Sequence, residues 1–139
     1  MTREQILSLE NYDLDIAVAK YVMKFAGPFS LTVPGLGTAW GRRYFIPYKS
    51  ELAGVAEYLG NKITAWQPHK DAAAAIEVAD EMNKQSYMCG MLNKDGTWSV
   101  GFDLKAENRI RHSAEHRSFS TAICRAALLR LLEDGAIMA

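Results

Sequence analysis

The sequence predicts an α+β fold in which helices cover a mainly antiparallel sheet. Three segments, 11–25, 71–82 and 118–132, repeat apolar residues at helical spacing. Two extended runs, 86–92 and 97–104, flank the sequence NKDG, which is typical of the turn of a β-hairpin. Helices that alternate with strands and one hairpin therefore indicate an α+β domain in which helices cover the sheet.

Two helices are predicted before the first proline. Thr2 and Gln5 have the spacing of a capping box, which indicates one or two helical turns near the start. Asn11 can cap a second helix, which we expect to end at Gly27. Its apolar residues form one stripe, made of Leu14, Ala17, Val18, Tyr21, Val22 and Phe25.

The next part of the chain is richer in proline and glycine. We predict a loop or an irregular strand over 28–41, followed by an extended run over 42–49. Residues 51–59 are expected to form a short helix, because four apolar residues share one helical face. These are Leu52, Val55, Ala56 and Leu59. A brief strand is predicted over 63–66, closed by Pro68.

The second half should contain two helices and the hairpin. Asp71 precedes an alanine-rich helix that ends before the polar residues 83–85. The hairpin face that we expect to be buried carries Trp98, Val100, Phe102 and Leu104. Residues 105–117 show no clean period, and either Ser118 or Ser120 can cap the final helix.

Composition limits the classes of function. The 16 basic and 16 acidic residues balance, so we expect no DNA or RNA duplex as a partner. No stretch reaches the 18 apolar residues of a membrane span, and the first residues are too charged for a signal peptide. Cys89 and Cys124 lack zinc-site spacing and fit buried thiols in a reducing compartment. We therefore expect one domain, residues 1–139, in the cytoplasm.

Two segments are nevertheless locally basic. The window between Asp15 and Glu51 has no acidic residue and contains Lys20, Lys24, Arg42, Arg43 and Lys49. The segment 104–118 contains Lys105, Arg109, Arg111 and Arg117 against two glutamates. An arginine fork can donate two hydrogen bonds to a phosphate, and an aromatic ring can stack on a nucleobase. Such segments favour a nucleotide ligand, although surface loops often collect arginine without binding anything.

Aromatic rings accompany both segments. Trp98 follows the hairpin turn, where the core is thin, so we expect a half-exposed ring that either stacks on a base or borders the core. The stretch PGLGTAWGRRYF combines three glycines with Arg42, Arg43 and Tyr44. Its glycines match neither the Walker pattern nor G-x-G-x-x-G, so they indicate neither a nucleotide hydrolase nor a dinucleotide fold.

Evidence for catalysis is weak in the sequence. HSAEH, residues 112–116, has the H-x-x-E-H form that a zinc protease places on a helix. Neighbouring arginines would repel a divalent metal, and no third ligand is evident. His69 stands alone after Pro68, and no Ser-His-Asp or Cys-His set is recognisable. We expect a protein that is not an enzyme and needs no metal and no cofactor.

Three stretches together carry a family resemblance: MTREQILSLENYDLDIAVAKYVM, WQPHKDAAAAIEVADEM and STAICRAALLRLL. With them, the chain resembles the small phage-encoded ABA-sandwich domain proteins over nearly its whole length. The match is most specific over 122–129. It is weaker at His69 and Lys70, which replace small hydroxyl residues, and the stretch 32–45 is not part of the family pattern.

One branch of this family is similar to the phage anti-Thoeris sponges, which capture a host immune signalling nucleotide, a cyclic ADP-ribose isomer. Some also hold cyclic oligonucleotides at a separate site formed on oligomerisation. The resemblance implies that Trp98 and Asn108 engage the cyclic ADP-ribose, that arginines bind its phosphates, and that Arg125 belongs to the second site. It also implies a homo-oligomer, a dimer or a trimer of dimers, in the cytoplasm of an infected bacterium.

Our hypothesis is therefore a sponge that sequesters a cyclic nucleotide without cleaving it. Trp98 would stack on the base and Asn108 would hydrogen-bond ribose or base. The expected ligand-binding residues are Trp98, Asn108, Arg109, Arg111, Arg125, Arg42, Arg43 and Tyr44. The alternative is a phage accessory protein that binds a host protein through an aromatic and basic surface.

Overall fold

The computed structural model describes residues 1–25, 42–46, 54–59, 62–103 and 114–138. The helices are α1 (Arg3–Ser8), α2 (Asn11–Val18), α3 (Ala72–Met82) and α4 (Phe119–Glu133), and one π-helical turn, η1 (Ala19–Met23), continues α2. The strands are β1 (Arg42–Ile46), β2 (Gly54–Leu59), β3 (Lys62–Trp66), β4 (Tyr87–Leu92), β5 (Trp98–Asp103) and β6 (Ala114–His116).

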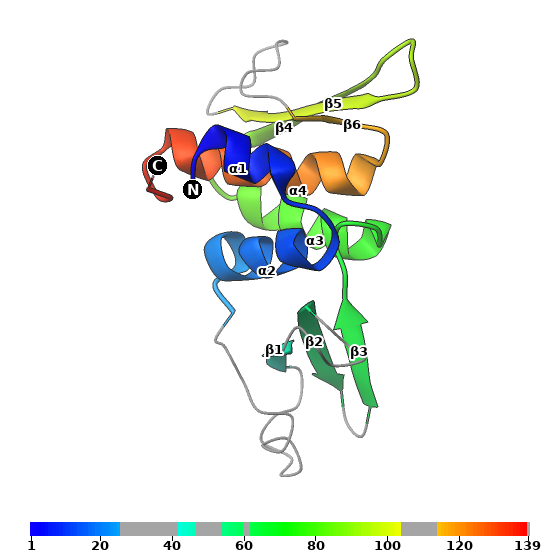
Figure 1. The fold of residues 1–139 in the computed structure, drawn as a ribbon, viewed down its shortest axis with the longest axis vertical. Coiled ribbons are helices and arrows are strands. Elements are labelled where there is room, and N and C mark those ends of the chain that lie inside the picture. The colour runs from blue at the N-terminus through cyan, green and yellow to red at the C-terminus, as the bar shows by residue number, and fades with distance from the viewer. Residues whose placement is uncertain (26–41, 47–53, 60–61, 104–113, 139) are drawn as a thin grey trace.

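The strands form two separate antiparallel sheets, in the orders β1-β2-β3 and β4-β5-β6. Figure 1 shows the second sheet lying over α1 and α4, with α2 and α3 on the far side of those helices and the first sheet beyond α2. The predicted α+β class with helices on antiparallel strands is confirmed. What the sequence did not indicate is the division of the strands into two sheets.

The N-terminal capping box forms as predicted. The Thr2 hydroxyl accepts the Gln5 backbone N–H, and the Gln5 side chain accepts the Thr2 N–H at 2.8 Å. The prediction that Asn11 caps the second helix is wrong, because Asn11 is the first helical residue of α2 and Glu10 is the N-cap. Asn11 has φ of 50°, a left-handed conformation that asparagine tolerates better than most residues.

The prediction of a helix over 51–59 is wrong, because residues 54–59 form strand β2. Val55 pairs with Phe45 of β1 on one side and with Trp66 of β3 on the other, so a hydrogen-bonded ladder runs along both edges. The apolar spacing fitted a helix as well as a strand, and this pairing decides between them. Gly54 has φ of +99° and lies against the Tyr12 ring, a conformation that favours glycine.

Most of the remaining elements are confirmed. Strand β1 lies within the predicted extended run, β3 begins one residue before the strand predicted over 63–66, and β4 and β5 form the hairpin. Asp71 caps α3 by accepting the Ala73 N–H, and Ser118 caps α4 by accepting the Thr121 N–H. Strand β6 lies in the segment that showed no period, and its three residues pair with Trp98, Ser99 and Val100.

Helix α4 is the centre of the core. Residues 120–130 are all buried, and the β5 side chains Val100 and Phe102 lie in the same hydrophobic cluster. The opposite face of β5 is also enclosed, since Ser99, Gly101 and Asp103 are buried too. The sheet is therefore covered more completely than a simple alternation of apolar and polar residues suggests. Within the described ranges, no helix has both the length and the apolar character needed to cross a bilayer.

Lys24 provides a test of the backbone at the end of η1. It has φ of 56° and ψ of 38°, the left-handed conformation in which glycine replaces other residues at low cost. Lys24→Gly should raise the free energy of unfolding by about 1 kcal/mol in urea titrations. Lys20→Gly, within η1, is the matched control and should lower it by about 1 kcal/mol. A loss of stability in Lys24→Gly would contradict this assignment.

Candidate ligand-binding site

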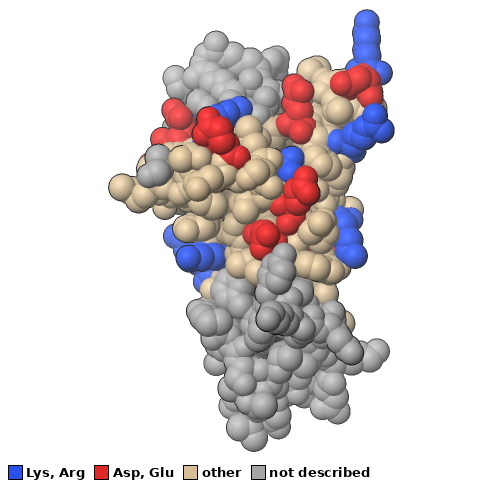
Figure 2. Space-filling view, in the orientation of Figure 1, with Lys and Arg blue, Asp and Glu red and all other residues tan. Residues whose placement is uncertain are grey.

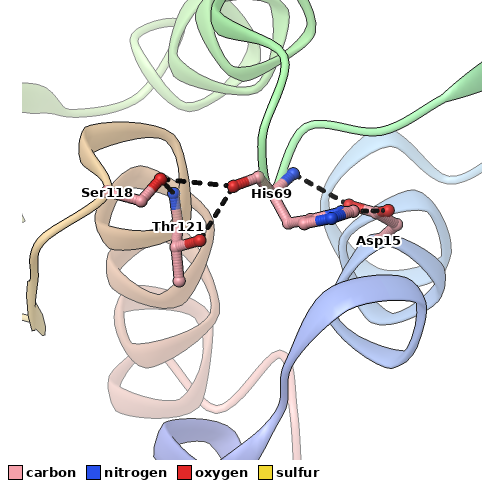
Figure 3. A network of polar contacts seen from close by, with 4 residues as sticks. All are labelled: Asp15, His69, Ser118 and Thr121. Atoms are coloured by element: carbon pink, nitrogen blue, oxygen red, sulfur yellow. Dashed lines mark hydrogen bonds and ion pairs between the residues drawn. The ribbon is translucent and has the colours of Figure 1, made fainter.

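A buried histidine–aspartate pair positions the elements around the site. Figure 3 shows His69, in the turn before α3, directed at Asp15 of α2. The Asp15 side chain is fully buried, and its two carboxylate oxygens contact the His69 backbone N–H at 2.9 Å and His69 Nδ1 at 2.6 Å. The Tyr12 ring packs edge-on against the imidazole. Both carboxylate oxygens of Asp15 therefore receive a hydrogen bond from a single residue, 54 positions away in the sequence.

The same histidine also holds the start of α4. Its backbone carbonyl accepts hydrogen bonds from the hydroxyls of Thr121 at 2.8 Å and Ser118 at 3.3 Å (Figure 3). One turn thus ties α2, α3 and α4 together. Burial raises the pKa of Asp15 to about 6, although the hydrogen bonds and charge of His69 oppose this.

These groups do not form a catalytic triad. The Ser118 hydroxyl donates to the backbone carbonyl of His69 and not to its ring, so the ring cannot activate it. Cys124, one turn further along α4, is fully buried, and burial raises the pKa of its thiol well above the usual value. A protonated, enclosed thiol is a poor nucleophile. The network therefore holds the fold together.

Trp98 lies at the rim of the second sheet. It is half-buried, as the sequence predicted, and its ring lies 4.6 Å from the ring of Phe119, the first residue of α4, between centroids. The two rings are tilted by 44°. Part of the indole therefore belongs to the core, and part stays available for a planar ligand.

His116 of β6 is the cross-strand partner of Trp98. Since paired residues of antiparallel strands point to the same face, the imidazole lies beside the indole. The Ser118 backbone N–H donates to His116 Nδ1 at 2.8 Å. Burial, followed by the positive charge of Arg125, lowers the pKa of His116, whereas the negative charge of Glu10 opposes this shift. The ring is therefore neutral near pH 7.

A surface hollow of about 420 Å³ is lined by Arg3, Leu7, Glu115 and Arg125. It is connected to His116 by two of these residues, because Glu115 precedes His116 in β6 and the charge of Arg125 lowers the pKa of His116. The Arg125 guanidinium is 7% exposed and donates twice to the Leu9 carbonyl, at 2.9 and 3.2 Å. It thus holds the end of α1 and contributes a positive charge to the hollow. Arg3 of α1 contributes a second cation from the exposed side.

A smaller cavity of about 120 Å³ lies where η1, α3 and α4 end. Two of its cations are already engaged, because Lys84 pairs with Glu81 at 2.7 Å and Arg130 pairs with Asp134. The carboxyl ends of helices also disfavour anions. Arg125 of the larger hollow is engaged as well, since it lies 4.0 Å from a Glu10 carboxylate oxygen, so the helix ends decide between the two cavities and make the hollow at Arg3 and Arg125 the better candidate for a phosphate.

The other predicted site residues cannot be placed in this site. Asn108, Arg109 and Arg111 lie outside the described residues, as do 28–41. Arg42, Arg43 and Tyr44 lie on β1, of which only the backbone is described. Of the eight predicted residues, only Trp98 and Arg125 have described side chains, and both lie around the β6 end of the second sheet and the first turns of α4. Their roles in binding stay predictions.

The H-x-x-E-H interpretation is not supported by local structure. A zinc protease needs this motif on a helix, but Ala114–His116 is strand β6, which turns Glu115 and His116 to opposite faces. The Glu115 carboxylate accepts from the Ser99 hydroxyl at 3.2 Å, and Asn93 donates to Ser99 at 2.8 Å. Glu115 is thus part of a polar network on the sheet.

Charge on the described surface is mixed. Figure 2 shows acidic side chains lying between the basic ones, without a broad basic field on this face. This agrees with the expectation that any anion site is local. Sequence reasoning missed His116, Arg3 and the His69–Asp15 pair. The single detectable signal was the position of His116 in a segment rich in arginine and histidine, whereas the pairing of His69 with Asp15 depends on tertiary structure.

Replacement of Asp15 tests the junction. Asp15→Ala should lower the free energy of unfolding by about 2–4 kcal/mol, because it leaves two donors of His69 without an acceptor. Asp15→Asn retains one acceptor oxygen and should cost about 1 kcal/mol. Asp13→Ala, an exposed position of the same helix, is the control and should change stability by less than about 0.5 kcal/mol. Equal stability of wild type and Asp15→Ala would refute the junction.

The raised pKa of Asp15 makes a separate prediction about pH. The folded protein holds this proton up to about pH 6, whereas the unfolded chain releases it near 3.8. The stabilising contribution of the protonated carboxyl is therefore complete below 3.8 and is lost as the pH rises through 6. Urea unfolding at pH 4.5 and 7.5 should show the wild type gaining stability relative to Asp15→Asn at the lower pH. If the two proteins differ in free energy of unfolding by the same amount at both pH values, the raised pKa of Asp15 is excluded.

Comparison with known proteins identifies the family. Residues 16–128 match the model of the phage ABA sandwich domain family. No curated protein and no solved structure matches the chain. The matched region begins within α2, one residue after Asp15, and ends within α4, so it includes His69 and all six strands. The chain therefore belongs to the phage ABA sandwich domain family.

Proposed function

We propose that the protein is a phage anti-defence sponge that binds a host immune signalling nucleotide, a cyclic ADP-ribose isomer, and sequesters it without cleavage. Cyclic oligonucleotides are a second ligand class for the same protein. The observation that carries this proposal is the position of Trp98, a half-buried ring beside His116 and close to a hollow that contains Arg3 and Arg125. An aromatic face next to guanidinium groups suits a base linked to phosphates.

Capture without turnover suits the chemistry of the described side chains. The buried thiol is protonated, and the Ser118 and Thr121 hydroxyls near the Asp–His pair both donate to a backbone carbonyl. Sequestration requires only donors, rings and enclosure. A nanomolar dissociation constant corresponds to about −12 kcal/mol, which for a small ligand requires nearly complete enclosure. The hollow is open, so we propose that a second copy of the chain completes the site in a homo-oligomer.

The edge strand β4 supports association. Its side chains Tyr87, Met91 and Leu92 are each more than half exposed. The strand itself carries no charged residue, and natural edge strands usually use charge or proline to prevent pairing. The same observation favours a second candidate function, a phage accessory protein that binds a host protein through this surface.

Ligand capture tests both functions. The purified protein is incubated with cyclic ADP-ribose isomers, the free ligand is removed, and bound ligand is recovered by heat denaturation and chromatography. We expect depletion of one isomer and its recovery unchanged. An altered product would indicate an enzyme. Failure to deplete any isomer, together with one stoichiometric host protein in a pull-down, would replace the sponge by the accessory protein.

Trp98 is the residue whose loss should matter most. Trp98→Ala should weaken capture about tenfold or more, since stacking of one base contributes about 1–3 kcal/mol. Trp98→Phe keeps a ring against Phe119 and should retain much of the affinity. Lys94→Ala, in the exposed hairpin turn, is the control and should bind as the wild type. Isothermal titration measures all four proteins, and equal affinity of Trp98→Ala and wild type would reject stacking at this residue.

A further inference from the structure

The two nitrogens of His116 have different environments. Nδ1 accepts a hydrogen bond of 2.8 Å from the Ser118 backbone N–H, so it carries no proton. A neutral imidazole must then hold its proton on Nε2. Nε2 has no hydrogen-bond partner among the described residues, and the ring is half-buried beside Trp98. Ser118 therefore fixes His116 as a donor whose N–H meets no acceptor in the part of the chain that the structure describes.

The surroundings keep the ring neutral. Burial and the positive charge of Arg125, from α4, disfavour protonation of the His116 ring. The negative charge of Glu10, between α1 and α2, favours protonation, but more weakly. Two charged residues adjoin His116 in the sequence. Glu115, on the same strand, accepts a hydrogen bond from Ser99 on the other face of the sheet, and Arg117, just after the strand, is exposed. Strand β5 contributes the uncharged indole of Trp98. A protonated ring would also direct Nδ1–H at the Ser118 N–H.

We propose that His116 Nε2–H is a specificity-determining donor of the ligand site, which binds an uncharged oxygen or nitrogen acceptor on the ligand while Arg3 and Arg125 bind its phosphate. The inference rests on the proposed function and deepens it. The ligand class is a phosphorylated nucleotide whose base or ribose presents a neutral acceptor close to the stacked ring. A ligand with phosphate alone would not use this donor.

Two substitutions separate the roles of the two nitrogens. Asparagine places its side-chain oxygen near the position of Nδ1, so His116→Asn can accept from Ser118 but lacks the outer donor. Glutamine places its amide nitrogen near the position of Nε2, so His116→Gln supplies the donor and loses the Ser118 bond. We expect His116→Asn to fold as stably as the wild type and to bind about 5- to 10-fold more weakly. His116→Gln should be less stable and bind within about twofold of the wild type.

The experiment titrates cyclic ADP-ribose isomers into wild type, both variants and the Lys94→Ala control, with urea unfolding of each protein. A purely structural histidine predicts the opposite order, in which His116→Gln is the weaker binder, and that result would overturn the proposal. If the wild type binds no isomer, the proposed function and this inference both fail. If the wild type binds and His116→Asn binds equally well, only this inference fails.

A spectroscopic measurement adds a readout that stability does not affect. In ¹⁵N-histidine-labelled wild type at pH 7, long-range proton–nitrogen spectra should assign the His116 proton to Nε2. Addition of the captured cyclic ADP-ribose isomer should shift that nitrogen resonance. A proton on Nδ1, or an unchanged Nε2 resonance at saturating ligand, would overturn the proposal.

Discussion

The buried carboxylate of Asp15 is the constraint on which the arrangement depends. A charged group removed from water destabilises the fold unless donors replace the water, and here a single residue, His69, supplies both. The turn before α3 must therefore lie against α2. Because the carbonyl of the same residue accepts two hydroxyls of α4, the first turn of α4 is fixed as well. Trp98 rests on Phe119 in that turn.

Local signals in the sequence were enough for the elements that carry their own caps and turns. The capping box of α1, the Asp71 cap and the NKDG hairpin are each decided within a few residues, and each forms as expected. Elements decided by distant partners could not be predicted in this way. Residues 54–59 become a strand because two other strands flank them, and β6 has only three residues, too few to show a period.

The residues of the candidate site also divide into those predicted by local sequence and those decided by tertiary structure. The half-exposed ring of Trp98 followed from its place after a turn, which is local information. His116 was visible only as part of a basic segment, and its importance arises from the Ser118 N–H and from register with Trp98. His69 gave no signal, since its partner lies 54 residues earlier. Arg125 was expected from the family resemblance to contact a ligand, and the structure adds a bond to Leu9 that sequence spacing does not indicate.

Ser118 connects the two parts of the molecule described above. Its N–H holds the His116 ring, and its hydroxyl donates to His69 and accepts the N–H of Thr121. Ligand binding at the proposed His116 site and the stability of the His69–Asp15 junction would thus be thermodynamically linked through one serine. A ligand that holds the imidazole would also stabilise the start of α4 and the buried carboxylate behind it, so the ligand-bound protein would resist denaturation more than the free protein.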